Sequence, residues 1–104
     1  MSDFEYEQQG DVITKDEVEA KEPPMYKVIL LNDDYTTMEF VVLVLQEVFR
    51  KTTAQAEQIM LKVHTEGAGT AGIYTKEVAE TKVTIVHHLA RQSEFPLKCI
   101  MESA

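Results

Sequence analysis

The segment TTMEFVVLVLQEVFRK, residues 36–51, is the feature that most constrains the fold of this 104-residue chain. It is apolar on nearly every side, and it is too long for an ordinary strand. Thr36 and Glu39 fit the Ser/Thr-x-x-Glu pattern of a capping box. We therefore predict a largely buried helix over 37–49, which the rest of the chain has to cover. The apolar run FVVLVL within it is far shorter than the roughly 20 residues of a membrane span.

Three short stretches predict strands. YKVILL, residues 26–31, is β-branched and apolar and is followed by turn residues. A glycine-rich loop leads into a short strand over 71–74. LKCIME, residues 97–102, alternates apolar and polar side chains, which is typical of a strand at the edge or on one face of a small sheet.

Two further helices are predicted from their end signals. Thr52, with Gln three residues later, repeats the capping-box pattern, and Gly67 stands at a helix C-cap position, so a helix over 53–66 is expected. Thr75 can cap a third helix, which ends before Pro96. The order β-α-α-β-α-β predicts an α+β sandwich with helices packed on one face of a three-stranded sheet.

The net charge of −8 is concentrated near the N-terminus. Residues 1–22 hold eight acidic and two basic side chains, whereas the rest holds ten acidic and eight basic ones. The first segment has no helical or strand period and few large apolar groups. We therefore predict a flexible acidic extension over 1–24 and a single core domain over 25–104.

The same composition excludes several classes of function. There is no cluster of Lys and Arg, so we expect no nucleic-acid partner. Cys99 is the single cysteine, which rules out an intramolecular disulfide and fits a reducing compartment. Without a secretory leader or a membrane span, the chain is predicted to be cytoplasmic. It shows no zinc, calcium or phosphate-loop spacing, so neither a metal nor a cofactor is expected.

The junction Asn32-Asp33-Asp34, between two apolar runs, is open to two interpretations. Asn and Asp after a strand are typical of turns and caps. The same residues suit a site that holds a positive charge beside an apolar pocket.

The histidines and methionines have structural interpretations as well. His64 lies one helical turn after Met60, and spacing alone favours a core histidine with a satisfied ring nitrogen. Met38 and Met60 are typical of gap-filling core. His87 and His88 are adjacent, point about 100° apart on a helix, and are interpreted as surface or edge residues.

Taken together, four segments resemble the ClpS family of bacterial protease adaptors: YKVILLNDDYTTMEFVVLVLQEVF, MLKVH, GIYTKEVAETK and FPLKCIME. The resemblance covers the chain from about Pro23 to its C-terminus. It implies a fold like the C-terminal domain of a ribosomal stalk protein, and no enzymatic activity. It also implies that the chain binds proteins that begin with Leu, Phe, Tyr or Trp and delivers them to the AAA+ unfoldase ClpA for degradation by ClpP.

The resemblance assigns roles to individual residues. It implies that the α-amino group of the substrate contacts Asn32, Asp34 and His64. It implies a side-chain pocket lined by Asp33, Thr36, Met38, Val41, Met60, Val63 and Leu97. It implies that Glu77 and Lys82 dock the N-terminal domain of the unfoldase. Thr37 stands where many members have Pro, a residue that stiffens the start of a helix.

Two alternatives remain open. The first is a stalk-like interaction module that does not recognise chain ends, in which Asn32, Asp34 and His64 serve only stability. The second is an enzyme that uses Asp33 or Asp34 with His64 as acid and base, although the sequence offers no evident nucleophile, metal set or cofactor loop.

Overall fold

The computed structural model describes residues 22–104, and within this range the predicted order β-α-α-β-α-β is confirmed. The elements in chain order are β1 (Met25–Leu31), α2 (Met38–Glu47), α3 (Thr53–Glu66), β2 (Ala68–Thr75), α4 (Lys76–Gln92) and β3 (Lys98–Ser103). The predicted flexible extension lies almost wholly outside the described residues. No helix of the described part is both long and apolar enough to cross a membrane.

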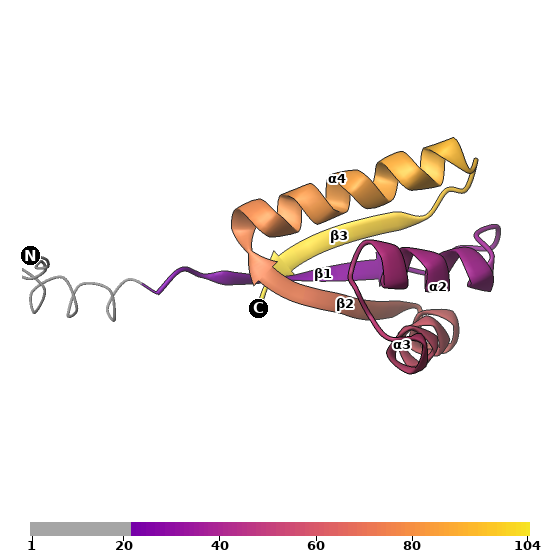
Figure 1. Cartoon of the computed structure of the whole chain (residues 1–104), viewed down its shortest axis with the longest axis horizontal. Coiled ribbons are helices and arrows are strands. Elements are labelled where there is room, and N and C mark those ends of the chain that lie inside the picture. Colours follow the sequence, from indigo (N-terminus) through magenta and orange to yellow (C-terminus); the bar gives the residue numbers. More distant parts are fainter. Residues whose placement is uncertain (1–21) are drawn as a thin grey trace, which may run out of the picture.

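The sheet has three antiparallel strands in the order β2-β1-β3, with β1 in the centre (Figure 1). Val28 and Leu30 of β1 are fully buried, whereas the alternate residue Ile29 stays partly exposed. Since successive side chains of a strand point to opposite faces, one face of the sheet carries the core. Helix α4 packs against all three strands, and α3 packs against β2. The predicted α+β class, with helices on one face, is confirmed.

Strand β2 is longer than the predicted 71–74, because Ala68, Gly69 and Thr70 also pair with β1. Glycine content had suggested a loop there. A Cβ at Gly69 would lie 2.8 Å from the Val63 side chain and 3.3 Å from the Ile59 carbonyl oxygen. Gly69 therefore lets α3 lie directly against the end of β2.

The start of α2 corrects one prediction. Thr37, not Thr36, is the N-cap, and its hydroxyl accepts a hydrogen bond from the Phe40 backbone N–H at 3.1 Å. The predicted capping box of Thr36 and Glu39 is wrong, because the Thr36 hydroxyl instead donates to the Asp33 carboxylate at 2.7 Å. Two adjacent threonines both fit the cap pattern, and the preceding turn decides between them.

The ends of α3 agree with prediction. Thr52 and Gln55 form a reciprocal capping box, and Gly67 ends the helix in the left-handed region with φ 91°. Thr75 is the N-cap residue of α4, but its side chain makes no capping hydrogen bond.

The C-terminus of α4 ends in a Schellman turn that places an aromatic side chain on α2. The backbone N–H of Phe95 donates to Ala90, that of Glu94 donates to Arg91, and Glu94 has φ 60°. The Phe95 ring lies 4.9 Å from the Phe40 ring, centroid to centroid. This contact joins the end of α4 to the start of α2.

Candidate functional site

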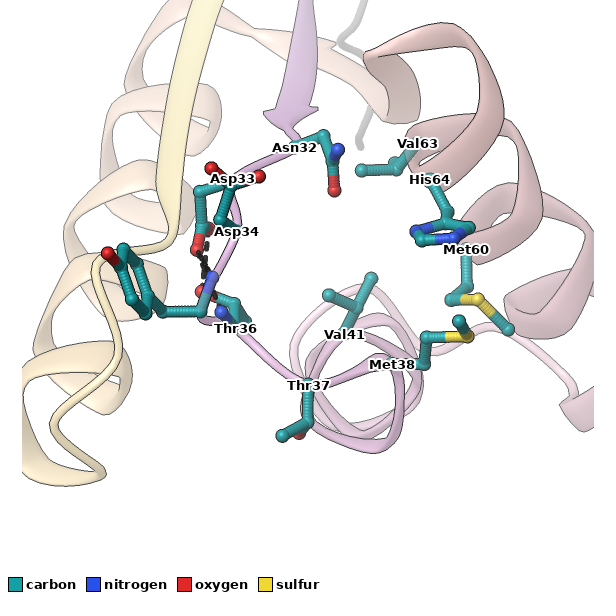
Figure 2. A pocket seen from close by; sticks show the side chains of 11 residues that line it. Asn32, Asp33, Asp34, Thr36, Thr37, Met38, Val41, Met60, Val63 and His64 are labelled. Carbon is teal, nitrogen blue, oxygen red and sulfur yellow. Dashed lines mark hydrogen bonds between the residues drawn. The ribbon is translucent and has the colours of Figure 1, made fainter.

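A hollow of about 390 Å³ opens between the β1–α2 loop and helix α3 (Figure 2). Its walls come from the β1–α2 loop, the first turn of α2 and the C-terminal half of α3. The residues that line it are Asn32, Asp33, Asp34, Tyr35, Thr36, Thr37, Met38, Val41, Met60, Val63 and His64. Two segments that lie about thirty positions apart in the sequence thus meet in one cavity.

Polar groups stand at the edge of this hollow. Figure 2 shows the side chains of Asn32 and His64 near one another, both extending into the hollow. The Asn32 backbone N–H donates to the Gly67 carbonyl at 3.0 Å, which fastens the end of β1 to the end of α3. Asn32, Asp34 and His64 are all exposed. The interpretation of His64 as a core histidine is therefore wrong: the turn it shares with Met60 faces the hollow, not the core.

Asp33 holds the loop in shape. One carboxylate oxygen accepts from the backbone N–H of Tyr35 at 2.8 Å and of Thr36 at 2.7 Å, and the other accepts the Thr36 hydroxyl. Burial raises the pKa of Asp33, but the hydrogen bonds from Thr36 and Tyr35 together outweigh it and hold that pKa below the ordinary 3.8. The Asp33 carboxylate therefore stabilises the turn, although Asp33 also lines the cavity.

The floor of the hollow is apolar. Val41 of α2 and Val63 of α3 are buried members of the core, so the floor is fixed by packing. Met38 stands at the mouth with 45% of its surface exposed, and Met60 is half-buried. The interpretation of Met38 as gap-filling core is wrong, because the first turn of α2 lies at the edge of the cavity.

One residue expected in the pocket lies elsewhere. Leu97 is buried in the core and lines a different hollow, beside His87 and Cys99. In the reverse direction, Tyr35 and Thr37 line the cavity without having been predicted. Both flank residues that were predicted, and only the fold of the turn brings them into the lining of the cavity.

The two residues expected to dock an unfoldase lie on α4, away from the cavity. Glu77 is exposed in the first turn. The Lys82 ammonium donates to the Val48 carbonyl at 2.7 Å and lies 5.6 Å from the centre of the Tyr74 ring. Lys82 therefore also joins α4 to the C-terminal end of α2.

His87 was expected at the surface or an edge, and it is half-buried against the edge strand β3. Its Nε2 accepts the Cys99 backbone N–H at 3.1 Å. Burial raises the pKa of the Cys99 thiol to about 12, so this thiol stays protonated at neutral pH. The pair contributes to structure and lies outside the hollow.

Comparison with known proteins identifies a family. Residues 21–100 match the family model described as ATP-dependent Clp protease adaptor protein ClpS. The chain is 58% identical over 98 residues to the ATP-dependent Clp protease adapter protein ClpS of Desulfotalea psychrophila, covering 94% of this chain and 96% of the relative. It is 56% identical over 102 residues to the protein of the same name from Desulfatibacillum aliphaticivorans, covering 98% of both.

A solved structure is similar as well. Agrobacterium tumefaciens ClpS2 bound to L-phenylalaninamide superposes with a TM-score of 0.77 at 37% sequence identity. The match covers 80% of this chain and all of the other. The similarity therefore extends over almost the whole described domain, including the elements that surround the hollow.

Proposed function

This chain belongs to the ClpS family of ATP-dependent Clp protease adaptors, and we propose that its hollow receives the first residue of a substrate protein, whose free α-amino group is held by Asn32, Asp34 and His64. The observation that carries the proposal is the juxtaposition of these three exposed polar side chains with a rigid apolar floor in one cavity.

The polar edge suits an ammonium group. An α-amino group has a pKa near 8 and is mostly charged at neutral pH. The Asn32 side-chain oxygen, the Asp34 carboxylate and a His64 ring nitrogen supply acceptors directly or through water. A hydrogen bond to a charged group contributes about 1.5–3 kcal/mol. A blocked terminus or an internal residue lacks both the charge and the extra donors, so these acceptors would remain unpaired.

The apolar floor suits a large first side chain. Burying Leu or Phe between Val41, Val63 and Met60 is worth about 1.5–3 kcal/mol, and flexible methionines adapt to aliphatic and aromatic guests alike. We expect Leu, Phe, Tyr and Trp to be accepted. Met38 at the mouth would clash with a side chain that is branched at Cβ. The ligand of the Agrobacterium relative supports this assignment, since L-phenylalaninamide carries a free amino group, a benzyl side chain and an amide where the next peptide bond would follow.

The bound substrate would then pass to a ClpA-type unfoldase, and Glu77 and Lys82 would contribute to docking its N-terminal domain. Binding and hand-over require no bond chemistry, so the proposed role is non-enzymatic. The enzyme alternative, which uses Asp33 or Asp34 with His64, loses one of its two candidate carboxylates, because both oxygens of Asp33 are engaged by the turn.

The deciding experiment compares two labelled peptides that start with Leu and differ only in N-terminal acetylation, by fluorescence anisotropy. We expect only the free peptide to bind, and the His64→Ala variant to bind it about tenfold more weakly. Equal binding of both peptides, or no binding of either, would favour the stalk-like module that does not recognise chain ends.

A further inference from the structure

A second hollow, of about 460 Å³, runs along the outside of the α2–α3 pair. Its apolar side chains are Met38, Val42 and Leu43 of α2 with Met60 and Leu61 of α3. We call it the α2–α3 groove. The first hollow, which we propose receives the first residue of a substrate, is called the first-residue site below. Neither the family resemblance nor the first-residue site assigns the groove a role.

The groove presents large apolar side chains to solvent. Leu43 of α2 is 47% exposed, and Leu61 of α3 is 52% exposed. In α2, Val44 and Leu45 are fully buried and already supply the core, so core packing does not explain the exposed Leu43 beside them. Apolar side chains gathered across two elements are typical of a binding surface.

The groove is continuous with the first-residue site. Met38 and Met60 line both hollows, so these two side chains form the wall between them. Figure 2 shows the two methionine side chains close together at one side of the first hollow. A peptide whose first side chain lies on one side of this wall has to leave across the rim. An extended chain advances about 3.3 Å per residue and turns alternate side chains to opposite sides. Within about 10 Å, therefore, one of the residues two to four can place its side chain in the groove.

The charge of the groove restricts what can enter. Glu39 and Glu57 lie among its lining residues, and no Lys or Arg of the described part does. An apolar side chain, or a basic one whose stem lies on Leu43 and Leu61, fits this environment. An acidic side chain is repelled.

From this continuity and charge we infer that the α2–α3 groove is a second recognition subsite, which binds an apolar side chain at one of positions two to four of the substrate. This inference rests on the proposed function, because it requires the first residue to be anchored beyond Met38 and Met60.

The test is a peptide scan read by anisotropy. The parent peptide begins Leu-Ala-Ala-Ala, and Leu or Asp replaces Ala singly at positions two, three and four. At one position we expect Leu to tighten binding about fivefold and Asp to weaken it about threefold. The Leu-to-Ala affinity ratio at that position should fall to near one in Leu43→Ala and Leu61→Ala. Ile73→Ala is the matched control, because Ile73 is also 52% exposed but lies on β2 and lines neither hollow.

The scan distinguishes failure of the groove subsite from failure of the first-residue site. If the parent peptide binds only with a free amino group but no position distinguishes Leu, Ala and Asp, the subsite is refuted and the first-residue site stands. If the parent peptide fails to bind, or binds equally when acetylated, the first-residue site fails and the subsite with it. If Leu43→Ala and Leu61→Ala leave every peptide ratio unchanged but weaken self-association or binding of an unfoldase N-terminal domain, the groove has another occupant and the inference is overturned.

Discussion

The neighbouring carboxylates Asp33 and Asp34 should separate stability from binding. Asp33 accepts three hydrogen bonds that shape the β1–α2 loop. Asp34 is exposed at the edge of the cavity, and no side-chain hydrogen bond links it to another described residue. Asp33→Ala should therefore lower the free energy of unfolding, whereas Asp34→Ala should leave it unchanged and weaken peptide binding.

The expected magnitudes follow from these contacts. Removing a side chain that caps backbone N–H groups costs about 0.5–2 kcal/mol. The Thr36 hydroxyl also loses its partner, but the site is only partly buried, so we expect about 1–2 kcal/mol for Asp33→Ala. For Asp34→Ala, loss of one charge-assisted bond to the peptide ammonium at an exposed site predicts about tenfold weaker binding.

The pH dependence provides an independent check on Asp33. Its pKa in the folded state is lowered from the ordinary 3.8, so folding favours the ionised form. The resulting stabilisation is complete above the pKa of the unfolded state and is lost as the pH falls through the lower pKa of the folded state. The difference in unfolding free energy between the wild-type chain and Asp33→Asn should therefore be constant from pH 7 to 5 and shrink below about pH 4.

Urea unfolding followed by circular dichroism, with peptide anisotropy on the same samples, measures both quantities. Asp33→Asn keeps one carbonyl oxygen as an acceptor and should lose less stability than Asp33→Ala. Equal losses of stability in Asp33→Ala and Asp34→Ala would refute the assignment of the turn to Asp33. So would a wild-type advantage over Asp33→Asn that grows on acidification.

Three further substitutions test other parts of the fold and site. Met38→Ala should raise the affinity of Val-start peptides relative to Leu-start peptides in anisotropy, and an unchanged ratio would show that Met38 does not exclude Cβ branches. Gly69→Ala, whose new methyl group would lie 2.8 Å from Val63 and 3.3 Å from the Ile59 carbonyl, should lose about 1–3 kcal/mol in urea unfolding; a neutral result would mean that α3 can move away from β2 freely. Glu94→Gly relieves a φ of 60° and should gain about 0.5–1 kcal/mol without altering peptide affinity, whereas a loss would show that the Glu94 side chain contributes more than the strain removes.

Helices and strands were predictable where local signals agree with the fold. The capping box at Thr52 and the glycine after α3 act within a few residues, so the bounds of α3 could be read directly. Where two local signals compete, the surrounding structure decides. Thr36 and Thr37 both suit an N-cap, and Asp33 takes one of them. Strand β2 begins earlier than expected, because pairing with β1 overrides the loop preference of a glycine-rich sequence.

The site was predictable as a set of residues only through the family resemblance. Periodicity showed that His64 and Met60 share a side of α3, but a helix in a small domain has a core side and a cavity side, and spacing does not distinguish them. Leu97 shows the converse limit, since it lines a hollow other than the first-residue site. Residues that line a cavity from a turn, such as Tyr35, carry no periodic signal at all.

The energetics of binding a chain end give the α2–α3 groove its significance. One buried Leu or Phe contributes about 1.5–3 kcal/mol, and each charge-assisted hydrogen bond contributes a similar amount. Association itself costs on the order of 4–15 kcal/mol in lost freedom. A hollow that holds one residue and its ammonium is thus left with a small net free energy, while micromolar affinity requires about 8 kcal/mol. One way to reach such an affinity is a well preorganised site, which the hydrogen bonds of Asn32 to Gly67 and of Thr36 to Asp33 favour. The other is a contribution from further residues of the substrate. Leu43 and Leu61 lie exposed just across the wall of that hollow, where a second side chain could supply the remainder without any change in the first-residue site.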